Sequence, residues 1–377
     1  MKGNETTMNI AFLAIASLHN PKESAYLTTL GLVKSLIQKG HRVVIITEKK
    51  AGLPQHEIMA GVPVYRLYRF PFLGRVFSYP FALRKIQRKL KIRFDIIHGF
   101  SATPLFAGSI ILSKLFSPNA KTVHTLKSYS RNEKANRGYF LLHGVDRVTI
   151  PTKVYGEKLG NIKKNKISLI HSPIDTIKFF PQDKKDLKKK YGYEKNKILF
   201  YYGAMWKNKG VDILIDAMPT LIQFYPDLKL VCAPRYENIQ EHRDLVKKLG
   251  LNHVVEFITG NIPIEEYVNF ADVVVLPYRN LQGTEGNPSC LLEAMSCKTL
   301  VVTTDLPELR EIANGLVFMA KPGDVDSLTE TIIQAMGKKD QEMIEKAYHK
   351  VQEFSFERIT EEFLKLYEKL VGNSYIV

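Results

Sequence analysis

The sequence predicts an α/β fold made of two doubly wound domains. Its 377 residues are too many for one small core, and at about 150 residues per domain they suggest two domains. Short runs rich in β-branched residues recur along the whole length and are apolar at every position. Such runs indicate strands buried on both faces, which belong to parallel sheets covered by helices.

Helical patterns separate these runs, and their order supports the parallel arrangement. After the run at 198–202, apolar residues from Val211 to Ile222 recur on one helix face. This order of strand and then helix recurs in both halves of the chain, and it predicts two doubly wound domains. Near the end, Ser355 is a good N-cap for a helix that continues to Leu370. The expected strands lie at residues 10–15, 43–47, 96–97, 148–150, 198–202, 228–231, 254–257, 273–276 and 300–304.

The domain boundary is expected near residue 173, where Ser172-Pro173 interrupts the pattern. We therefore expect an N-terminal domain over residues 1–173, a C-terminal domain over 174–352 and a final helical segment over 353–377. An apolar run near the start imitates a secretory signal, but it leads into a helical pattern, which favours a first strand.

Composition excludes several classes of protein and points to anionic partners. Hydrophobic residues at 45% and charged residues at 24% are typical of a folded protein, not of a disordered chain, collagen or a coiled-coil rod. A net charge of +16 favours nucleic acid, an acidic membrane surface or phosphorylated small molecules as partners. The lysine-rich stretch at 184–190 is more typical of a solvated helix face than of a nucleic-acid site. Neither a disulfide framework nor a metal site fits the three cysteines, Cys232, Cys290 and Cys297, which favours a reducing compartment.

The most informative segment is 283–293, G-T-E-G-N-P-S-C-L-L-E, which follows an expected strand. Its G-N pair favours a turn, and Pro288 suits the first position of a helix. Glu285 is thus expected in a loop above the strand end, with Glu293 two turns into the helix. The first-turn amides of that helix suit an anion. Without the rest of the chain as context, the two carboxylates are as typical of a surface pair and a capping arrangement as they are of a binding site.

With this segment in its context, the chain resembles the GT-B fold glycosyltransferases of family 4, the retaining group. Their E-x7-E motif usually reads E-G-x-x-x-x-L-L-E-A-M, and residues 285–295 fit it. Other family patterns follow in the expected order along nearly the whole chain, and together they are specific. They are K-G-H-R-V at 39–43, F-D-I-I-H at 94–98, T-V-H at 122–124, G-V-D at 210–212, A-D at 271–272 and F-S-F at 354–356. The resemblance implies two Rossmann-like domains facing across a cleft, with the last helix crossing back to the N-terminal domain.

The resemblance also implies a role for each matched residue. Glu293 would bind the ribose hydroxyls of a nucleotide diphosphate sugar, and Glu285 would contact the transferred sugar. His124, from the other domain, would reach the sugar near the reacting centre, with a satisfied strand-end histidine as the alternative. His98 is expected to be structural. Backbone amides facing the sugar and the phosphates would come from Asn287, Ser289 and Cys290.

The phosphates of the donor are the expected ligands of Lys209, which lies where the chain leaves one strand and enters the next helix. Its full charge would add to the partial positive charge of the helix N-terminus and hold a diphosphate. The family usually has an arginine just after the glycine at 203, and this chain has Ala204. One cation is therefore present where two are expected, with Trp206 or Lys207 as candidates to compensate.

Two further features bear on donor and metal binding. Glu23-Ser24 replaces the family's usual glycine pair, which leaves the role of the first loop, 20–24, open. D-V-D at 324–326 spells the metal signature of a different glycosyltransferase fold, but Asp324 opens a helix, where capping is the favoured role. With Lys209 and helix amides supplying positive charge, no metal and no cofactor are expected besides the nucleotide diphosphate sugar as co-substrate.

A strongly basic segment, residues 69–94, also contains several aromatic residues. In the helix expected there, Leu83, Ile86 and Leu90 form one narrow apolar stripe. This pattern is equally typical of a solvated basic face and of a peripheral membrane surface whose cations meet anionic headgroups. The cations opposite the stripe include Arg84, Lys85, Arg88 and Lys89.

Together these features predict a retaining, hexosyltransferase-type glycosyltransferase that acts in glycan biosynthesis. The C-terminal domain would hold the nucleotide sugar, and the N-terminal domain a glycan or lipid-linked acceptor. A cytoplasmic location, with a possible peripheral site on the cytoplasmic face of a membrane, is expected, and a nucleic-acid partner is not. The alternatives are another GT-B reaction, by a nucleotide-sugar epimerase or a phosphorylase, and a non-catalytic basic scaffold that binds membrane or nucleic acid.

Overall fold

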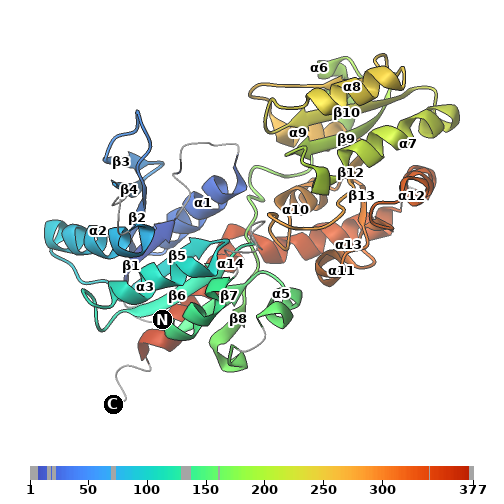
Figure 1. The fold of residues 1–377 in the computed structure, drawn as a ribbon. Coiled ribbons are helices and arrows are strands. Elements are labelled where there is room, and N and C mark those ends of the chain that lie inside the picture. Colours follow the sequence, from blue (N-terminus) through green and yellow to red (C-terminus); the bar gives the residue numbers. More distant parts are fainter. Residues whose placement is uncertain are drawn as a thin grey trace. The chain divides into compact units, whose positions relative to one another are not determined.

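The computed structural model describes residues 7–14, 18, 23–68, 74–128, 137–159, 162–338 and 340–372. The chain divides into two compact units. Unit 1 consists of Met1–Pro173, Gly283–Gly286 and Phe356–Val377, and unit 2 consists of Ile174–Gln282 and Asn287–Ser355. Each unit is a twisted sheet with helices on both faces (Figure 1).

The sheet of unit 1 has the strand order β3-β4-β2-β1-β5-β6-β7-β8, and its pairs are parallel except for the β3–β4 hairpin. Its strands are β1 (Asn9–Ala14), β2 (Arg42–Glu48), β3 (His56–Met59), β4 (Val62–Leu67), β5 (Ile96–Ser101), β6 (Lys121–Leu126), β7 (Arg147–Ile150) and β8 (Ile167–Leu169). Its helices are α1 (Ser24–Gln38), α2 (Gly74–Leu90), η1 (Pro104–Phe106), α3 (Ala107–Ser113), η2 (Arg137–Gly144), α5 (Lys153–Lys158), η3 (Lys164–Lys166) and α14 (Phe356–Gly372).

The last helix, α14, belongs to unit 1 and packs against α1. A Cβ atom at Gly31 of α1 would lie 2.2 Å from the Phe356 ring, so glycine permits this close approach. On the same helix, the Tyr367 hydroxyl lies 2.6 Å from Nδ1 of His98. Nε2 of His98 lies 2.6 Å from the Thr125 hydroxyl, so both ring nitrogens are engaged inside the unit. The apolar residues on one face of this helix are buried: Ile359, Phe363, Leu366 and Leu370.

The sheet of unit 2 has the strand order β11-β10-β9-β12-β13-β14, and all its pairs are parallel. Its strands are β9 (Lys197–Gly203), β10 (Leu228–Pro234), β11 (Val255–Phe257), β12 (Val273–Leu276), β13 (Val301–Thr304) and β14 (Phe318–Ala320). Its helices are α6 (Lys184–Tyr191), η4 (Lys207–Lys209), α7 (Val211–Phe224), α8 (Gln240–Lys248), α9 (Ile264–Phe270), α10 (Ser289–Ser296), α11 (Pro307–Ala313), α12 (Val325–Lys338), α13 (Gln341–Val351) and η5 (Gln352–Phe354).

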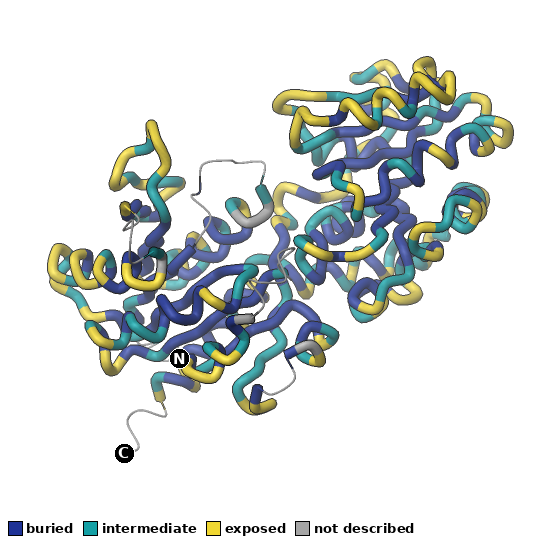
Figure 2. Tube along the Cα trace, in the orientation of Figure 1, coloured by how far each residue is buried: buried dark blue, intermediate teal, exposed yellow. Residues whose placement is uncertain are grey.

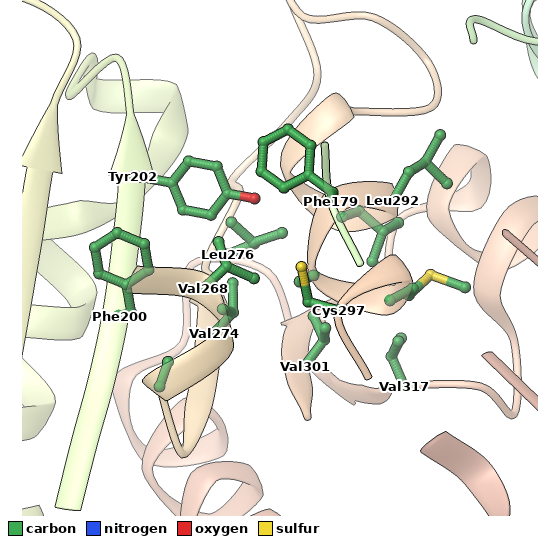
Figure 3. Close-up of a cluster of buried hydrophobic side chains, with 14 of the residues drawn as sticks. Phe179, Phe200, Tyr202, Val268, Val274, Leu276, Leu292, Cys297, Val301 and Val317 are labelled. Atoms are coloured by element: carbon green, nitrogen blue, oxygen red, sulfur yellow. The ribbon is translucent and has the colours of Figure 1, made fainter. Parts of the chain in front are cut away.

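Each sheet has a hydrophobic core on both faces, which explains the continuous apolar runs. In β9, Phe200 and Tyr202 point into one core of unit 2, whereas Leu199 and Tyr201 point into the other. Figure 3 shows the first core, where Phe200 and Tyr202 gather with residues of β12 and with Leu292 of α10. The inner strands of both sheets are buried, and exposed residues collect on the outer helices, the loops and the edge strand β3 (Figure 2).

The predicted fold class is confirmed, since the structure is an α/β fold with two doubly wound sheets. Every expected strand is present, although Ile15 lies outside the described residues. The hairpin of β3 and β4 was not expected, because β3 is short and half-exposed and lacks a continuous apolar run. Helix α10 begins one residue later than expected, with Pro288 as its N-cap. Asp324 accepts a hydrogen bond of 3.0 Å from the Ser327 amide at the start of α12, which is the expected capping role.

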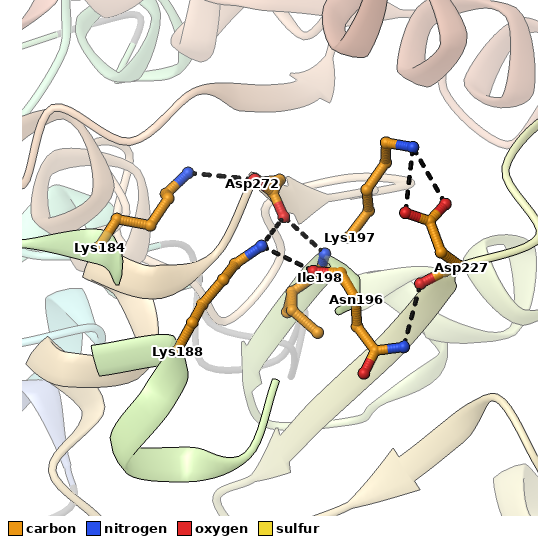
Figure 4. A network of polar contacts seen from close by, with 7 residues as sticks. All are labelled: Lys184, Lys188, Asn196, Lys197, Ile198, Asp227 and Asp272. Carbon is orange, nitrogen blue, oxygen red and sulfur yellow. Dashed lines mark hydrogen bonds and ion pairs between the residues drawn. The ribbon is translucent and has the colours of Figure 1, made fainter. Parts of the chain in front are cut away.

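The lysine-rich stretch at 184–190 lies on α6, and several of its side chains have acidic partners inside unit 2. Asp272 accepts contacts from Lys184 at 3.3 Å and from Lys188 at 2.6 Å, and the Ile198 amide donates to it at 2.8 Å (Figure 4). Although burial alone would raise the pKa of Asp272, these donors hold it below its usual range. Lys190 pairs with Glu266 at 2.5 Å. These contacts favour the solvated helix face over a nucleic-acid site.

Candidate active site

In open parallel sheets, ligands bind beyond the carboxyl ends of the strands where the strand order reverses. In unit 2 that point lies between the neighbours β9 and β12, because β10 and β11 extend the sheet on one side and β13 and β14 on the other. The chain leaves β9 at Gly203 and β12 at Leu276. The loops that follow lead to Lys209 and to α10, so this end of the sheet carries the residues predicted to bind the donor.

Arg279 ties these two loops together. Its guanidinium donates to both carboxylate oxygens of Asp212, at 2.6 and 2.8 Å, and to the carbonyl of Lys207 at 2.7 Å. Its backbone amide donates to the carbonyl of Asn208 at 2.9 Å. A bidentate, charge-assisted pair of this kind fixes geometry as well as adding stability. The loop that carries Lys209 is therefore held against the loop after β12.

Lys209 is placed by a turn that requires glycine next to it. Gly210 has a φ of 71°, and a Cβ atom there would lie 1.9 Å from the carbonyl oxygen of Pro277. Lys209 itself is only 8% exposed, and its Nζ lies 4.8 Å from the centroid of the Tyr278 ring. A cation so close to the strand end can act on a ligand there. Lys207, in contrast, points to solvent.

Glu293 lies on α10 and is half-buried. Burial raises the pKa of Glu293 to about 7, while a hydrogen bond from the Tyr202 hydroxyl and the charge of Arg235 act in the opposite direction. The single hydroxyl proton of Tyr202 also has the carbonyl of Cys290 as an acceptor, at 3.0 Å, so the two acceptors share it, and this contact joins the end of β9 to the first turn of α10. A carboxylate so placed is able to accept hydrogen bonds from two neighbouring hydroxyls.

The Cys290 thiol lies within the electric field of three charged groups of unit 2. Burial and the carboxylate of Glu293 raise the pKa of Cys290 to about 12, and the charges of Arg235 and Lys209 act to lower it. The charges of Glu293, Arg235 and Lys209 therefore all act on this thiol, and such effects weaken with distance. A thiol with this pKa is protonated at neutral pH and is no nucleophile. The first turn of α10, where Ser289 and Cys290 were expected to face the donor, belongs to the same group.

Glu285 is placed differently from the expectation, because residues 283–286 cluster with unit 1 and not with the C-terminal unit. The backbone of Glu285 forms an antiparallel bridge with Ser128, just beyond β6. In addition, the Tyr155 hydroxyl donates to the carbonyl of Thr284 at 3.2 Å. These contacts are long-range pairings of backbone and side chain, which the local pattern of the segment does not reveal.

Lys127 is the cation that faces Glu285. Its Nζ lies 3.6 Å from Oε1 of Glu285, and the two side chains are only 10% and 12% exposed. Lys127 also donates to the Thr28 hydroxyl and lies 5.3 Å from the centroid of the Phe100 ring. Burial lowers the pKa of Lys127, and the charge of Glu285 acts to raise it. The carboxylate of Glu285 thus has a fixed, largely dehydrated cation beside it.

His124, on β6, is fully buried in unit 1. Among the described residues, neither of its ring nitrogens has a hydrogen-bond partner, and the ring meets Phe106 edge-on at 6.3 Å. Burial lowers the pKa of His124 to about 3, so the imidazole is neutral at physiological pH. The alternative of a satisfied strand-end histidine describes His98, whose two nitrogens have partners, and not His124.

The remaining predicted residues are also placed by the structure. Asn287 is fully buried in unit 2. The four cations of α2 are exposed; the Arg84 guanidinium lies 4.8 Å from the Phe116 ring and Lys89 lies 5.5 Å from the Tyr65 ring. Residues 20–22 of the first loop and 69–73 of the basic segment lie outside the described residues. In the described part of the chain, no helix has both the length and the hydropathy needed to cross a bilayer.

Sequence reasoning missed Arg235 and Lys127. Arg235 directly follows β10, and Lys127 directly follows β6. Their positions at the carboxyl ends of strands are a signal that could have selected them, since parallel sheets bind ligands at that edge. What the sequence does not contain is the neighbour of each side chain, which depends on how the strands pair.

Two doubly wound, mainly parallel sheets are the architecture of the GT-B glycosyltransferases. Residues 183–350 match the family model described as Glycosyl transferases group 1, and residues 27–178 match the one described as Glycosyltransferase Family 4. The chain belongs to the GT-B glycosyltransferases of family 4.

Three known proteins show how far this similarity extends. The chain is 24% identical to an uncharacterised glycosyltransferase of Methanocaldococcus jannaschii, over 90% of this chain and 92% of that protein. It is 24% identical to the GPI3 subunit of a phosphatidylinositol N-acetylglucosaminyltransferase of Saccharomyces cerevisiae, over 81% of this chain and 70% of that protein. The crystal structure of Anabaena HepE in complex with UDP-glucose has a TM-score of 0.77 at 17% identity, over 96% of this chain and 100% of that one. This last likeness shows a common fold.

Proposed function

We propose that the protein is a retaining, hexosyltransferase-type glycosyltransferase that uses a nucleotide diphosphate sugar in glycan biosynthesis. The observation that carries the proposal is the group of Lys209, Glu293 and the first turn of α10 at the carboxyl ends of β9 and β12. This group offers a carboxylate for the ribose hydroxyls, and a cation and a helix N-terminus for phosphates. The UDP-glucose bound by HepE, which has the same fold, supports this class of donor.

In the proposed reaction, the bond between the anomeric carbon and the diphosphate breaks, and the acceptor oxygen forms its bond on the same face of the sugar. The acceptor proton passes to the departing diphosphate, so no other base is needed. Lys209 and the amides of Ser289 and Cys290 stabilise the charge that develops on the leaving group. Glu285 and the neutral imidazole of His124 hold the sugar, and the buried Lys127 keeps Glu285 in place. The proposed reaction does not use a metal ion.

The direct test is a thermal-shift screen with UDP, GDP, ADP and TDP sugars. A ligand at 100 times its dissociation constant stabilises a protein by about 2.7 kcal/mol, which is a readily measured shift. One nucleotide is expected to raise the melting temperature, and Lys209→Ala is expected to remove most of that rise. If no nucleotide sugar shifts the wild-type melt, the donor site is wrong.

We further propose that the acceptor is a glycan or a lipid-linked molecule, reached at the cytoplasmic face of a membrane. The support is the exposed basic face of α2, beside which Phe77 and Phe81 are also exposed. The membrane lipid in the name of the yeast relative points the same way. Near an anionic bilayer each cation contributes about 1 kcal/mol, so neutralising Arg84, Lys85, Arg88 and Lys89 should cost about a thousandfold in membrane affinity.

Vesicle co-sedimentation with and without anionic lipid tests this surface. The matched control neutralises four exposed lysines of unit 2, Lys185, Lys189, Lys247 and Lys248, and so changes the net charge equally. The α2 variant should lose binding to anionic vesicles, as added salt should make the wild type do. Equal sedimentation of the wild type and the α2 variant would show that the basic face is only solvated.

A further inference from the structure

Arg235 lies next to the position where the expected phosphate-binding arginine is missing. Strands β9 and β10 are parallel and in register, with Pro234 opposite Gly203. The amide of Arg235 donates to the carbonyl of Gly203 at 2.8 Å. Ala204, which replaces the usual arginine, follows Gly203 directly and is buried. The backbone of Arg235 is thus anchored one strand away from Ala204, at the same edge of the sheet.

The side chain of Arg235 is half-buried and available to a ligand. Among the residues that the structure describes, no carboxylate lies within ion-pair distance of its guanidinium. By comparison, Arg279 on the loop after β12 is held by Asp212. The next residue along the chain, Tyr236, stacks on Trp206 with centroids 5.8 Å apart, which links the two loops on which Arg235 and Lys209 lie.

The charge of the Arg235 guanidinium acts on the residues at the carboxyl ends of β9 and β12. Burial raises the pKa of the Glu293 carboxyl, the Cys290 thiol and the Tyr278 hydroxyl, and the charge of Arg235 opposes this rise in each of them. Lys209 acts on the same thiol. The charges of Arg235 and Lys209 thus act on the first turn of α10, near the carboxylate of Glu293, on which Lys178 and Glu265 also act. Positive charge at a helix N-terminus is favourable when an anion binds.

We propose that Arg235 supplies the second cation of the diphosphate site, from the end of β10 instead of the end of β9. Its planar, five-donor guanidinium suits bidentate contact with phosphate oxygens, whereas Lys209 acts as a point charge. The inference rests on the proposed function and adds to it a residue that compensates for Ala204. It also explains how a chain with Ala204 keeps two cations for two phosphates.

The test compares a nucleoside diphosphate with its nucleoside, which shares every contact except those to phosphate. The base is the one selected by a thermal-shift screen of UDP, GDP, ADP and TDP. In calorimetry, Arg235→Gln should bind the diphosphate about 10- to 100-fold more weakly, the effect of a lost charged hydrogen bond, and the nucleoside within about twofold of wild type. The diphosphate affinity of Arg235→Lys should lie between that of the wild type and that of Arg235→Gln. Arg243→Gln, which removes an exposed arginine of α8, is the matched control and should bind as wild type does.

A second variant restores the cation at the family's usual position. Ala204→Arg in the Arg235→Gln background should recover diphosphate affinity at least in part. If Arg235→Gln does not fold, as judged by its melting without ligand, the same affinities are measured for Arg235→Lys, alone and combined with Ala204→Arg. Unchanged diphosphate affinity in the Arg235 variant, or an equal loss of affinity for nucleoside and diphosphate, would overturn this inference but not the proposed function. Failure of all four nucleotides to bind the wild type would overturn the proposed function and this inference with it.

Discussion

The residues assigned to donor and sugar form two groups, one in each unit, and their electrostatics differ. In unit 2, the charges of Lys209 and Arg235 act on the same thiol as the carboxylate of Glu293, whose pKa is raised to about 7. In unit 1, Lys127 already pairs with Glu285 at 3.6 Å, and His124 is neutral and buried. The first group carries charge that a ligand can neutralise, whereas the second is balanced within the protein.

This difference predicts how the effects of mutation should divide. Residues that offer charge to an anionic ligand contribute to binding in the ground state. Residues held in a balanced, rigid arrangement contribute where geometry matters, in the transition state. Variants of unit 2 should therefore change nucleotide affinity, with a further loss of turnover for Lys209, whereas variants of unit 1 should change turnover and leave nucleotide affinity nearly intact.

The largest effect is expected for Glu285→Gln. Loss of one preorganised electrostatic contact to the reacting sugar should lower turnover about 100- to 1000-fold, while affinity for the nucleoside diphosphate stays nearly intact. The measurements are release of nucleoside diphosphate from the donor identified by thermal shift, and calorimetry of the free diphosphate. Equal losses in affinity and rate would place Glu285 among the residues that shape the nucleotide pocket.

Lys127→Met comes next and tests the balance inside unit 1. Removing one member of a largely buried pair leaves the carboxylate of Glu285 without its cation, at a cost of up to about 3 kcal/mol in the free energy of unfolding. Turnover should fall as well, and Lys127→Arg should restore part of it. Denaturant unfolding and turnover are measured together.

The control for Lys127 is Lys114→Met. It breaks the Lys114–Asp146 pair of the same unit, whose side chains are 33% and 29% exposed. A pair so open to solvent should cost about 1 kcal/mol or less, and turnover should not change. A Lys127 variant that behaves like this control would show that the pair with Glu285 has no catalytic role.

Glu293→Ala should weaken nucleotide binding by about 1.5–3 kcal/mol, the range for hydrogen bonds to a charged group. Because the ribose is bound alike in substrate and transition state, turnover at saturating donor should change much less. Calorimetry with the nucleoside diphosphate gives the affinity. Wild-type affinity in this variant would refute the ribose contact.

The smallest effect is the pH dependence of donor affinity. The ionised form of Glu293 is the better acceptor for ribose hydroxyls, and its pKa is raised to about 7. Affinity for the nucleotide sugar should therefore fall a few-fold as the pH decreases from 8 to 6. Glu293→Gln should make the profile flat, and a wild-type profile that is already flat would separate Glu293 from binding.

The sequence was sufficient for the fold class because buried parallel strands produce continuous apolar runs, as in β9 and β12. It also pointed to Lys209 and Glu293, which both follow strands that are neighbours where the strand order reverses. It did not reveal that residues 283–286 cluster with unit 1, because the bridge of Glu285 to Ser128 is a long-range pairing. For the same reason it missed Arg235. The position of Arg235 beside Gly203 follows from the pairing of β9 with β10 and not from the neighbours of Arg235 in sequence.

The most direct test of the division between the units is the nucleoside diphosphate affinity of two double variants, measured side by side by calorimetry. One is Lys209→Ala with Glu293→Ala in unit 2, and the other is His124→Asn with Glu285→Gln in unit 1. We predict that the unit 2 variant loses more than about 100-fold in affinity, from two charged contacts, while the unit 1 variant binds within about threefold of wild type. A unit 1 variant that loses as much affinity as the unit 2 variant would contradict the account.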